Sequence, residues 1–226
     1  MRLILTLTIF FSSILMVSSQ SYEWIRGRDL NYSMNPDMIN YTLCTSPDGT
    51  IWQGGLKNFI EFYSEGMGDQ FLANYDAGGV LLNDYEISGS AVLHSMKADN
   101  EGYLYITGQY ISDLHFWDGH LLAFTGPFIN TFMAKINPAG SVEWVKNLST
   151  AFPDATDGDI AIHGDHVFLA LSNWPASIIG EFDGDGNLLN TISQDAVGIV
   201  SGIAVDATGN IYATGSCPNA GSTFGE

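Results

Sequence analysis

The sequence predicts an all-β protein built from repeats, and three observations support that prediction. Aromatic residues form 12% of the 226 residues and Gly occurs 25 times, whereas Lys and Arg together occur only 7 times, a profile that suits short strands and tight turns. After the N-terminus, no segment keeps apolar residues at the i, i+3, i+4 and i+7 positions of an amphipathic helix. Two short sequence phrases also alternate along the chain, and such self-similarity indicates a repeat architecture.

The two phrases define the repeat. The first is a turn followed by an aromatic-rich strand, and it occurs at residues 48–52, 101–105, 165–168 and 208–212. The second is a strand, a Gly turn and another strand, and it occurs at residues 71–81, 132–142 and 179–188. Both recur at intervals of about 45 to 65 residues, near the roughly 40 to 50 residues of a four-stranded propeller blade with insertions in its loops. We therefore predict an incomplete β-propeller of four-stranded antiparallel blades.

The second repeat shows how the strands of one blade are assigned. Its four strands are predicted at 92–97, 103–108, 131–137 and 142–148, with a long loop at 109–130. Pro138 and Gly140 supply the backbone angles of the turn before the outer strand. The same pattern assigns three blades and the start of a fourth, at residues 39–88, 91–149, 158–193 and 199–226.

The first 19 residues have the features of a signal peptide. Arg2 gives a charged start, residues 3–17 are mostly apolar, and Val17, Ser18 and Ser19 are small enough for cleavage before Gln20. The apolar run is short for a membrane span, although an uncleaved anchor is the alternative. We expect an exported protein, secreted or held at the cell surface, with a mature region at 20–226 and no membrane span after cleavage.

Residues 20–30 are predicted to form an outer strand with no inner strands before it. The segment 21–26 (SYEWIR) closely matches the predicted outer strand at 141–146 (SVEWVK). Propellers often complete their last blade with an N-terminal strand, which leaves no open sheet edge. About three and a half blades and one closing strand do not make a ring, so we expect the sequence to be the N-terminal part of a longer protein.

The fourth repeat resembles a known family. Residues 205–216 (VDATGNIYATGS) closely resemble the core of the bacterial SBBP-type β-propeller repeat, and residues 132–148 resemble its second half, with Trp144 interpreted as a packing residue between blades. The third copy, at 163–166 (HGDH), has lost the turn Asp and Asn. The resemblance implies a propeller in an exported protein, of a kind found in Bacteroidetes-like bacteria. It implies no particular activity.

The net charge limits the partners to be expected, and the cysteine content limits the disulfides. The formal net charge is −18, and a polyanionic surface repels phosphate backbones, so we expect no nucleic-acid partner. The same charge is compatible with cation binding, although solubility is the favoured explanation. The two cysteines, Cys44 and Cys217, are too few for a disulfide-dense scaffold, and we expect two unpaired, partly buried thiols.

Three acidic residues form the candidate metal site. Asp154, Asp157 and Asp159 lie where one blade should join the next, and such loops usually border the ligand-binding face of a propeller. Carboxylate oxygens suit calcium, and a solvated acidic loop is the alternative. Residues 183–187 (DGDGN) also begin like a calcium loop, but sister repeats use the same position as a hairpin turn. We expect no other cofactor.

Two groups of histidines were weighed as ligand sites. His163 and His166 flank Asp165, but a zinc site needs further donors that the sequence does not reveal. His115 and His120 lie in the long loop with residues 116–118 (FWD), a combination that suits a sugar-binding surface. The alternative is a loop that folds its aromatic residues onto the blade.

No catalytic motif is recognisable. The chain lacks a Gly-x-Ser-x-Gly elbow, a phosphate-binding loop and a zinc-protease helix motif. The inner strands begin with Tyr41, His94, Asp159 and Gly202, a set too mixed to indicate a shared catalytic funnel. We therefore predict a non-catalytic binding or structural scaffold at the cell exterior, with an extracellular protein or carbohydrate as partner. The alternative is the propeller portion of a secreted polysaccharide-acting enzyme.

Overall fold

The computed structural model describes residues 40–59, 67–126, 128–153, 155–173, 176–194 and 199–216. The chain divides into two units, Met1–Tyr32 and Ser33–Glu226, and every described residue belongs to the second. The predicted signal peptide and closing strand therefore lie outside the described residues. Within the described part, no helix is long and apolar enough to span a membrane.

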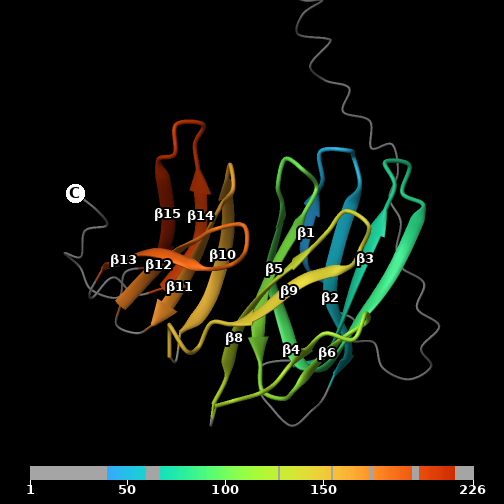
Figure 1. The fold of residues 1–226 in the computed structure, drawn as a ribbon, viewed down its shortest axis with the longest axis horizontal. Helices are drawn as coiled ribbons and strands as arrows, with labels where there is room; N and C mark the ends of the chain where they lie inside the picture. The colour runs from blue at the N-terminus through green and yellow to red at the C-terminus, as the bar shows by residue number, and fades with distance from the viewer. Residues whose placement is uncertain are drawn as a thin grey trace, which may run out of the picture. The chain divides into compact units, whose positions relative to one another are not determined.

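The regular structure of the described residues consists of antiparallel strands (Figure 1). The first blade contains β1 (Asn40–Thr45), β2 (Ile51–Phe59), β3 (Gly68–Tyr75) and the first half of β4 (Leu81–Ala98). The second blade contains the rest of β4, β5 (Leu104–Tyr110), β8 (Asn130–Ile136) and β9 (Val142–Asn147). The third contains β10 (Thr156–His163), β11 (His166–Asn173), β12 (Ala176–Phe182) and β13 (Leu188–Gln194). Two strands of a fourth follow, β14 (Ile199–Val205) and β15 (Ile211–Ser216).

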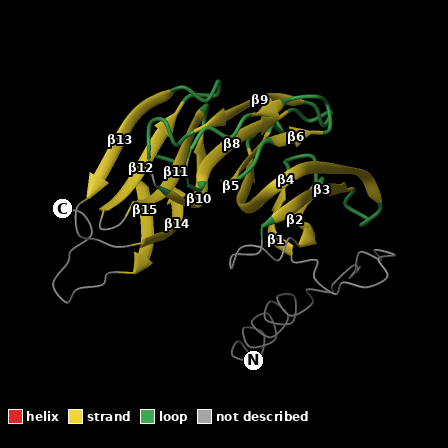
Figure 2. Cartoon of the chain, turned by 90° about the horizontal axis from the view of Figure 1, so that it is seen from below, coloured by secondary structure: helices red, strands yellow, loops and turns green. Residues whose placement is uncertain are grey.

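The order of these strands is that of a propeller. Within each blade the four strands pair in chain order, with β6 and β7 lying outside the series of blade 2. The innermost strands of successive blades are neighbours: β1 lies beside β4, β4 beside β10, and β10 beside β14 (Figures 1 and 2). The described strands do not close into a ring. The predicted fold class, an incomplete β-propeller of four-stranded antiparallel blades, is therefore confirmed.

The first two blades share a strand. The pairing of β4 with β3 runs to Ala91, and its pairing with β5 begins at the same residue, so the outer strand of blade 1 continues directly into the inner strand of blade 2. The sequence pattern had suggested two separate strands. As a result, blades 1 and 2 form one nine-stranded sheet, whereas blade 3 is a separate four-stranded sheet.

The Gly-containing turns share one backbone geometry. The amide of the first turn residue donates to the carbonyl four residues on, and the amide of the Gly three residues on donates back to the first carbonyl; the first residues are Ser46, Asp76, Asp99, Asn137, Asp183 and Asp206. An Asp or Asn in this place also accepts from the turn amides, as Asp206 does from Thr208 and Asn210, both at 2.9 Å. These bonds explain why five of these six turns begin with Asp or Asn and all six have Gly three residues later. The turn of the third repeat is different, because His163 pairs directly with His166.

Hydrophobic cores lie between adjacent blades. One buried cluster joins blades 1 and 2, a second joins blades 2 and 3, and a third joins blade 3 to β14 and β15. Trp144 on β9 covers the β12–β13 turn, where its Nε1 donates to the carbonyl of Gly184 at 3.2 Å. A Cβ on Gly186 would lie 2.8 Å from the same indole ring. Trp144 thus packs between blades, as its place in the repeat predicted.

Replacing Gly140 by Ala tests the equivalent contact between blades 1 and 2. Gly140 has a φ of 89°, and an added Cβ would lie 1.9 Å from the hydroxyl of Tyr85 on β4. Gly119 is the matched control, because its φ is 95° but no atom lies within 4 Å of its Cβ position. We expect Gly119→Ala to lower the free energy of unfolding by about 1 kcal/mol through backbone strain. Gly140→Ala should cost roughly 3 kcal/mol, because Tyr85 must also move.

Chemical denaturation of both variants measures this difference. Equal losses at the two positions would show that Tyr85 does not press against the turn of blade 2.

Candidate functional site

Each innermost strand carries one extra residue at the same place in its pairing. The shifts in register fall between Asn40 and Thr42, Leu93 and Ser95, Asp157 and Ile160, and Val200 and Gly202. A bulge bends its strand and redirects side chains, and such irregularities are common beside functional sites. The inner strands of a propeller surround its axis, so this row of bulges is where a site should be sought.

Asp159 is the acidic residue at the centre of this region. Its Oδ1 accepts hydrogen bonds from Ser95 Oγ at 2.7 Å and from the Ile160 amide at 2.9 Å. Its Oδ2 accepts from the amide of Ile203 at 3.3 Å. Ser95 lies on β4 of blade 2, Asp159 on β10 of blade 3, and Ile203 on β14, the inner strand of the fourth blade. One half-buried carboxylate therefore connects the inner strands of three successive blades.

The three predicted calcium ligands have different outcomes. Asp154 lies outside the described residues, and Asp157, on β10, is described only through its backbone, which pairs with Leu171 on β11. Asp159 is engaged by the three donors just named. Among the described residues, no group of three or more His, Cys, Asp or Glu side chains is arranged to hold a metal ion. The calcium site stays a prediction from the sequence.

Sequence reasoning missed the partners of Asp159. Ser95 and Ile203 are 64 and 44 residues away from it in the chain, and a hydroxyl and a backbone amide carry no motif. The signal that was available is the place of Asp159 in the inner strand. The pairing shows that Ser95, like Thr42 and Gly202, follows the extra residue of its own strand.

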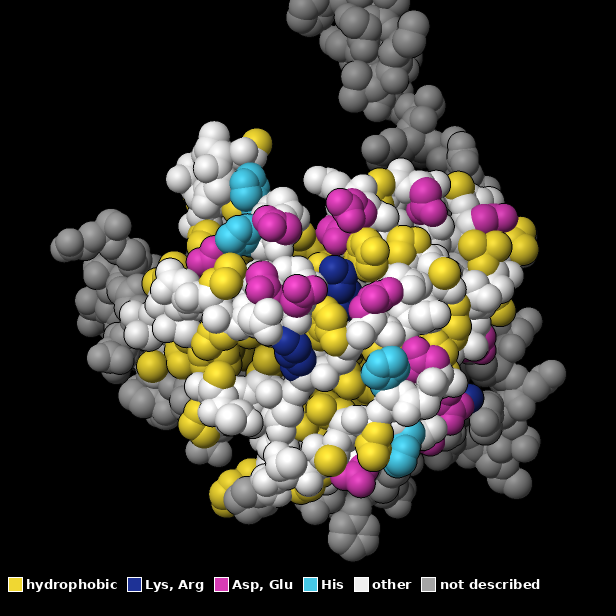
Figure 3. Space-filling view, in the orientation of Figure 1, with side chains coloured by type: hydrophobic (Ala, Val, Ile, Leu, Met, Phe, Trp, Pro, Cys, Tyr) yellow, Lys and Arg dark blue, Asp and Glu magenta, His cyan; other side chains and the backbone are white. Residues whose placement is uncertain are grey.

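His163 and His166 lie at the β10–β11 turn, and His166 contacts two acidic side chains. His166 Nδ1 is 2.7 Å from Glu181 Oε1, and its Nε2 is 3.5 Å from Asp165 Oδ1. His163 faces the next blade, with its Nε2 3.7 Å from the Cβ position of Gly209. The two imidazoles therefore approach different neighbours, and the structure does not gather them around one point. Figure 3 shows His side chains lying among Asp and Glu side chains on the face of the molecule that Figure 1 presents.

The long loop of the second repeat folds onto the blades. It contains β6 (Leu114–Phe116) and β7 (Leu121–Leu122), and Phe116 pairs with Ile87 on β4 while its side chain is only 4% exposed. Trp117 stacks on Tyr85 with ring centroids 4.5 Å apart. The expected alternative to a sugar-binding surface, a loop that packs its aromatic residues, is therefore what the structure shows at these two rings.

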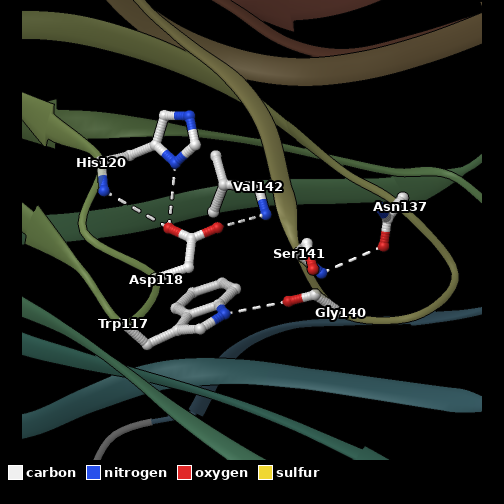
Figure 4. A network of polar contacts seen from close by, with 7 residues as sticks. All are labelled: Trp117, Asp118, His120, Asn137, Gly140, Ser141 and Val142. Atoms are coloured by element: carbon white, nitrogen blue, oxygen red, sulfur yellow. Dashed lines mark hydrogen bonds and ion pairs between the residues drawn. The ribbon is translucent and has the colours of Figure 1, made fainter.

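Polar side chains of the same hairpin bind the β8–β9 turn (Figure 4). Trp117 Nε1 donates to the carbonyl of Gly140 at 2.9 Å, and Asp118 Oδ2 accepts from the amide of Val142 at 2.8 Å. His120 Nδ1 lies 3.0 Å from Asp118 Oδ1. Partial burial raises the pKa of Asp118, but the bonds from His120 and Val142 outweigh it and hold that pKa below its ordinary value. This cluster attaches the β6–β7 hairpin, which we call the insertion of blade 2, to the β8–β9 turn.

The residues 183–187 form a turn that uses its own carboxylate. Asp183 Oδ1 accepts from the amides of Asp185 at 3.0 Å and Asn187 at 2.8 Å, and Oδ2 accepts from Asn187 Nδ2 at 3.0 Å. The bonds from the Asn187 amide and side chain lower the pKa of Asp183. The interpretation of this segment as a hairpin turn is confirmed.

Cys44 is a free, half-buried thiol on β1, and Cys217 lies outside the described residues. Burial raises the pKa of Cys44 to about 12, although the nearby charge of Lys97 and a backbone hydrogen bond lower it in part. The nucleophilic thiolate is therefore scarce at neutral pH. Cys44 is not a candidate catalytic nucleophile.

Comparisons with known proteins give no family. No protein-family model and no curated protein matches the chain. Among solved structures, a protein of unknown function from Bacteroides caccae is 12% identical with a TM-score of 0.47, covering 80% of this chain and 54% of its own. The propeller of Dos1 is 9% identical with a TM-score of 0.39, covering 78% and 66%. A lignostilbene dioxygenase from Pseudomonas brassicacearum is 12% identical with a TM-score of 0.41, covering 74% and 40%. The chain thus spans about half the length of the first of these proteins.

Substituting Asp159 tests whether its carboxylate holds blades together. We expect Asp159→Ala to lower the free energy of unfolding by about 2 to 4 kcal/mol, because Ser95 and Ile203 lose an acceptor and the Ile160 amide keeps only a longer contact with Ser95 Oγ at 3.4 Å. Asp165→Ala is the control, since this side chain is 88% exposed and its change should stay within about 0.5 kcal/mol. Urea denaturation followed by tryptophan fluorescence gives both values. A loss at Asp159 no larger than at Asp165 would contradict the bridging role.

Proposed function

We propose that this chain is the repeat region of an exported protein that binds or supports partners at the cell exterior without catalysing a reaction. The observation that carries the proposal is that both carboxylate oxygens of Asp159 accept hydrogen bonds from the protein itself. This best-placed acidic side chain of the inner strands accepts them from Ser95, Ile160 and Ile203, which occupy both of its oxygens and fix its position. A general acid or nucleophile needs an oxygen free to meet a substrate.

The carboxyl groups of two Gly-containing turns support the same proposal. Asp183 and Asp206 accept hydrogen bonds from their own turns, and those bonds lower the pKa of each carboxyl. An acid that must donate a proton near neutral pH needs the opposite shift. The carboxylates of these turns are thus suited to structure and solubility.

The exported setting is supported by sequence features. Residues 1–19 have the pattern of a signal peptide, and residues 205–216 resemble the SBBP-type repeat of exported bacterial proteins. The charge of −18 disfavours nucleic acid as a partner, which leaves an extracellular protein or carbohydrate. We infer a secreted or surface-held product.

One observation favours the rival function, a propeller that acts on polysaccharides. The bulges of all four inner strands coincide, and half-buried His94 lies beside Ser95 at one of them. Bulges often aim side chains into a site. The experiment below therefore includes catalysis as a measured outcome.

Expression of the full chain in an exporting bacterial host tests both parts of the proposal. We expect the mature protein outside the cytoplasm with Gln20 as its first residue, by intact-mass analysis and N-terminal sequencing. Incubation with a panel of soluble plant and bacterial polysaccharides should release no new reducing ends. Retention of residues 1–19 in a membrane pellet would contradict cleavage before Gln20, and protein found only in the cytoplasm would contradict export. Release of reducing ends that disappears in His94→Ala, a variant that still melts cooperatively, would overturn the non-catalytic assignment.

A further inference from the structure

Among the described residues, no strand pairs with the outer edge of blade 3. The sheet has the order β10-β11-β12-β13, so β13 pairs with β12 on one side only. Figure 2 shows β13 at the margin of its sheet. A strand in this position offers a row of backbone donors and acceptors to another strand.

The β6–β7 hairpin of blade 2 covers part of the outer strand of each of the other two blades, although Leu81 and Leu82 at the start of β4 stay about half exposed. At the outer half of β4, Ile87 and Ser88 pair with Phe116 and His115 of β6. On β9, the Val142 amide donates to Asp118 Oδ2 at 2.8 Å. Farther along β9, Asn147 Nδ2 donates to Thr125 Oγ1 at 2.9 Å. Blade 3 has no equivalent insertion, because β11 ends at Asn173 and β12 begins at Ala176.

The sequence of β13 also lacks the usual protection of an edge. Its seven residues, LLNTISQ, include no charge and no proline, whereas β9 carries Glu143 and Lys146. Leu188, Leu189 and Ile192 are 41%, 51% and 50% exposed. Edge strands normally carry charges, prolines or covers that discourage pairing. An uncharged, aliphatic and open edge is therefore an exception that a partner strand would explain.

One edge amide is already bonded in a way that a partner can replace. The amide of Thr191 donates to the side-chain Oδ1 of the adjacent Asn190 at 2.8 Å. A side chain next in sequence is an easily displaced acceptor, since the Asn190 side chain is exposed. The carbonyl of an added strand can take its place without disturbing the pairing with β12.

We propose that β13 binds an extended segment of another protein by strand addition, a segment that is uncharged and β-branched in its middle and basic at the end that meets the β12–β13 turn. Strand addition draws its affinity from backbone hydrogen bonds and its specificity from alternate side chains. Leu189 and Ile192 stand an odd number of residues apart and so face opposite sides of the sheet, which suits apolar residues on both faces of the partner. The proposal rests on the binding role proposed above and names its surface.

Charge selects this partner over a second copy of the chain. The turn that precedes β13 carries Asp183 and Asp185, and the whole chain has a net charge of −18. Two copies paired through β13 would bring two strongly acidic bodies together, whereas Lys or Arg at the end of a partner strand would meet Asp183 and Asp185 favourably.

A synthetic peptide tests the proposal directly. The probe is a fluorescein-labelled peptide of alternating Thr and Val with Lys at both ends, and fluorescence anisotropy with the full chain measures its binding. We expect saturable binding that weakens at least about tenfold in Thr191→Pro, which lacks the edge amide and carries a protruding ring. Thr191→Val is the matched control, because it keeps the amide and should bind as the wild type does. Ile192→Lys, which adds a charge without touching the backbone, should also weaken binding.

Control peptides separate the possible outcomes. The same peptide with alternate amides N-methylated should not bind, and one with Asp in place of Lys should bind more weakly. Binding that is unchanged by both Thr191→Pro and Ile192→Lys, or no binding at all, would overturn the proposal. Concentration-dependent dimers in sedimentation velocity that vanish in Thr191→Pro would overturn the choice of partner in favour of a second copy. None of these outcomes depends on export or on polysaccharide cleavage, so the proposed function is judged separately.

Discussion

The structure depends on contacts between blades, and the Asp159 carboxylate makes such a contact with the inner strands on both sides of its own blade. A four-stranded sheet must bury its faces, and a propeller does so by packing each blade against the next. Asp159 adds a polar connection where the strands are innermost, since it accepts from Ser95, Ile160 and Ile203 on three successive blades. Both oxygens of this half-buried carboxylate accept hydrogen bonds, which offset the cost of removing them from water.

The same principle recurs at the outer ends of the blades. Trp144 of blade 2 covers the Gly186 turn of blade 3, and Tyr85 of blade 1 lies against the Gly140 turn of blade 2. Glycine is needed in these turns because its φ is positive and also because the neighbouring aromatic ring occupies the place of a Cβ.

The carboxylates of the turns also contribute to stability. The folded-state pKa of Asp183 and of Asp206 is depressed, so the stability that each contributes is present above the ordinary pKa of Asp and is lost as the pH falls through the depressed value.

The features that the sequence predicted are those governed by local chemistry. The Asp-x-x-Gly turns, the aromatic strands after them and the packing place of Trp144 follow from residues close together in the chain, and the structure contains them. The sequence could not show that β4 runs unbroken through two blades, nor that β6 would return to pair with Ile87. It placed Asp159 in a calcium loop, although the partners of this residue are a hydroxyl and an amide far away in the chain. Contacts of that kind depend on the register of whole strands, which no local pattern encodes.

Amide hydrogen exchange at Ile203 tests the central claim most directly. This amide lies on β14 and donates to Asp159 Oδ2 on the neighbouring blade, so its protection reports the contact between blades. We predict slow exchange in the wild-type protein, and markedly faster exchange at Ile203 in Asp159→Ala, while amides within blade 1 such as Leu72 keep their protection. Exchange at Ile203 that is fast in the wild type, or that is the same with and without the carboxylate, would contradict the account.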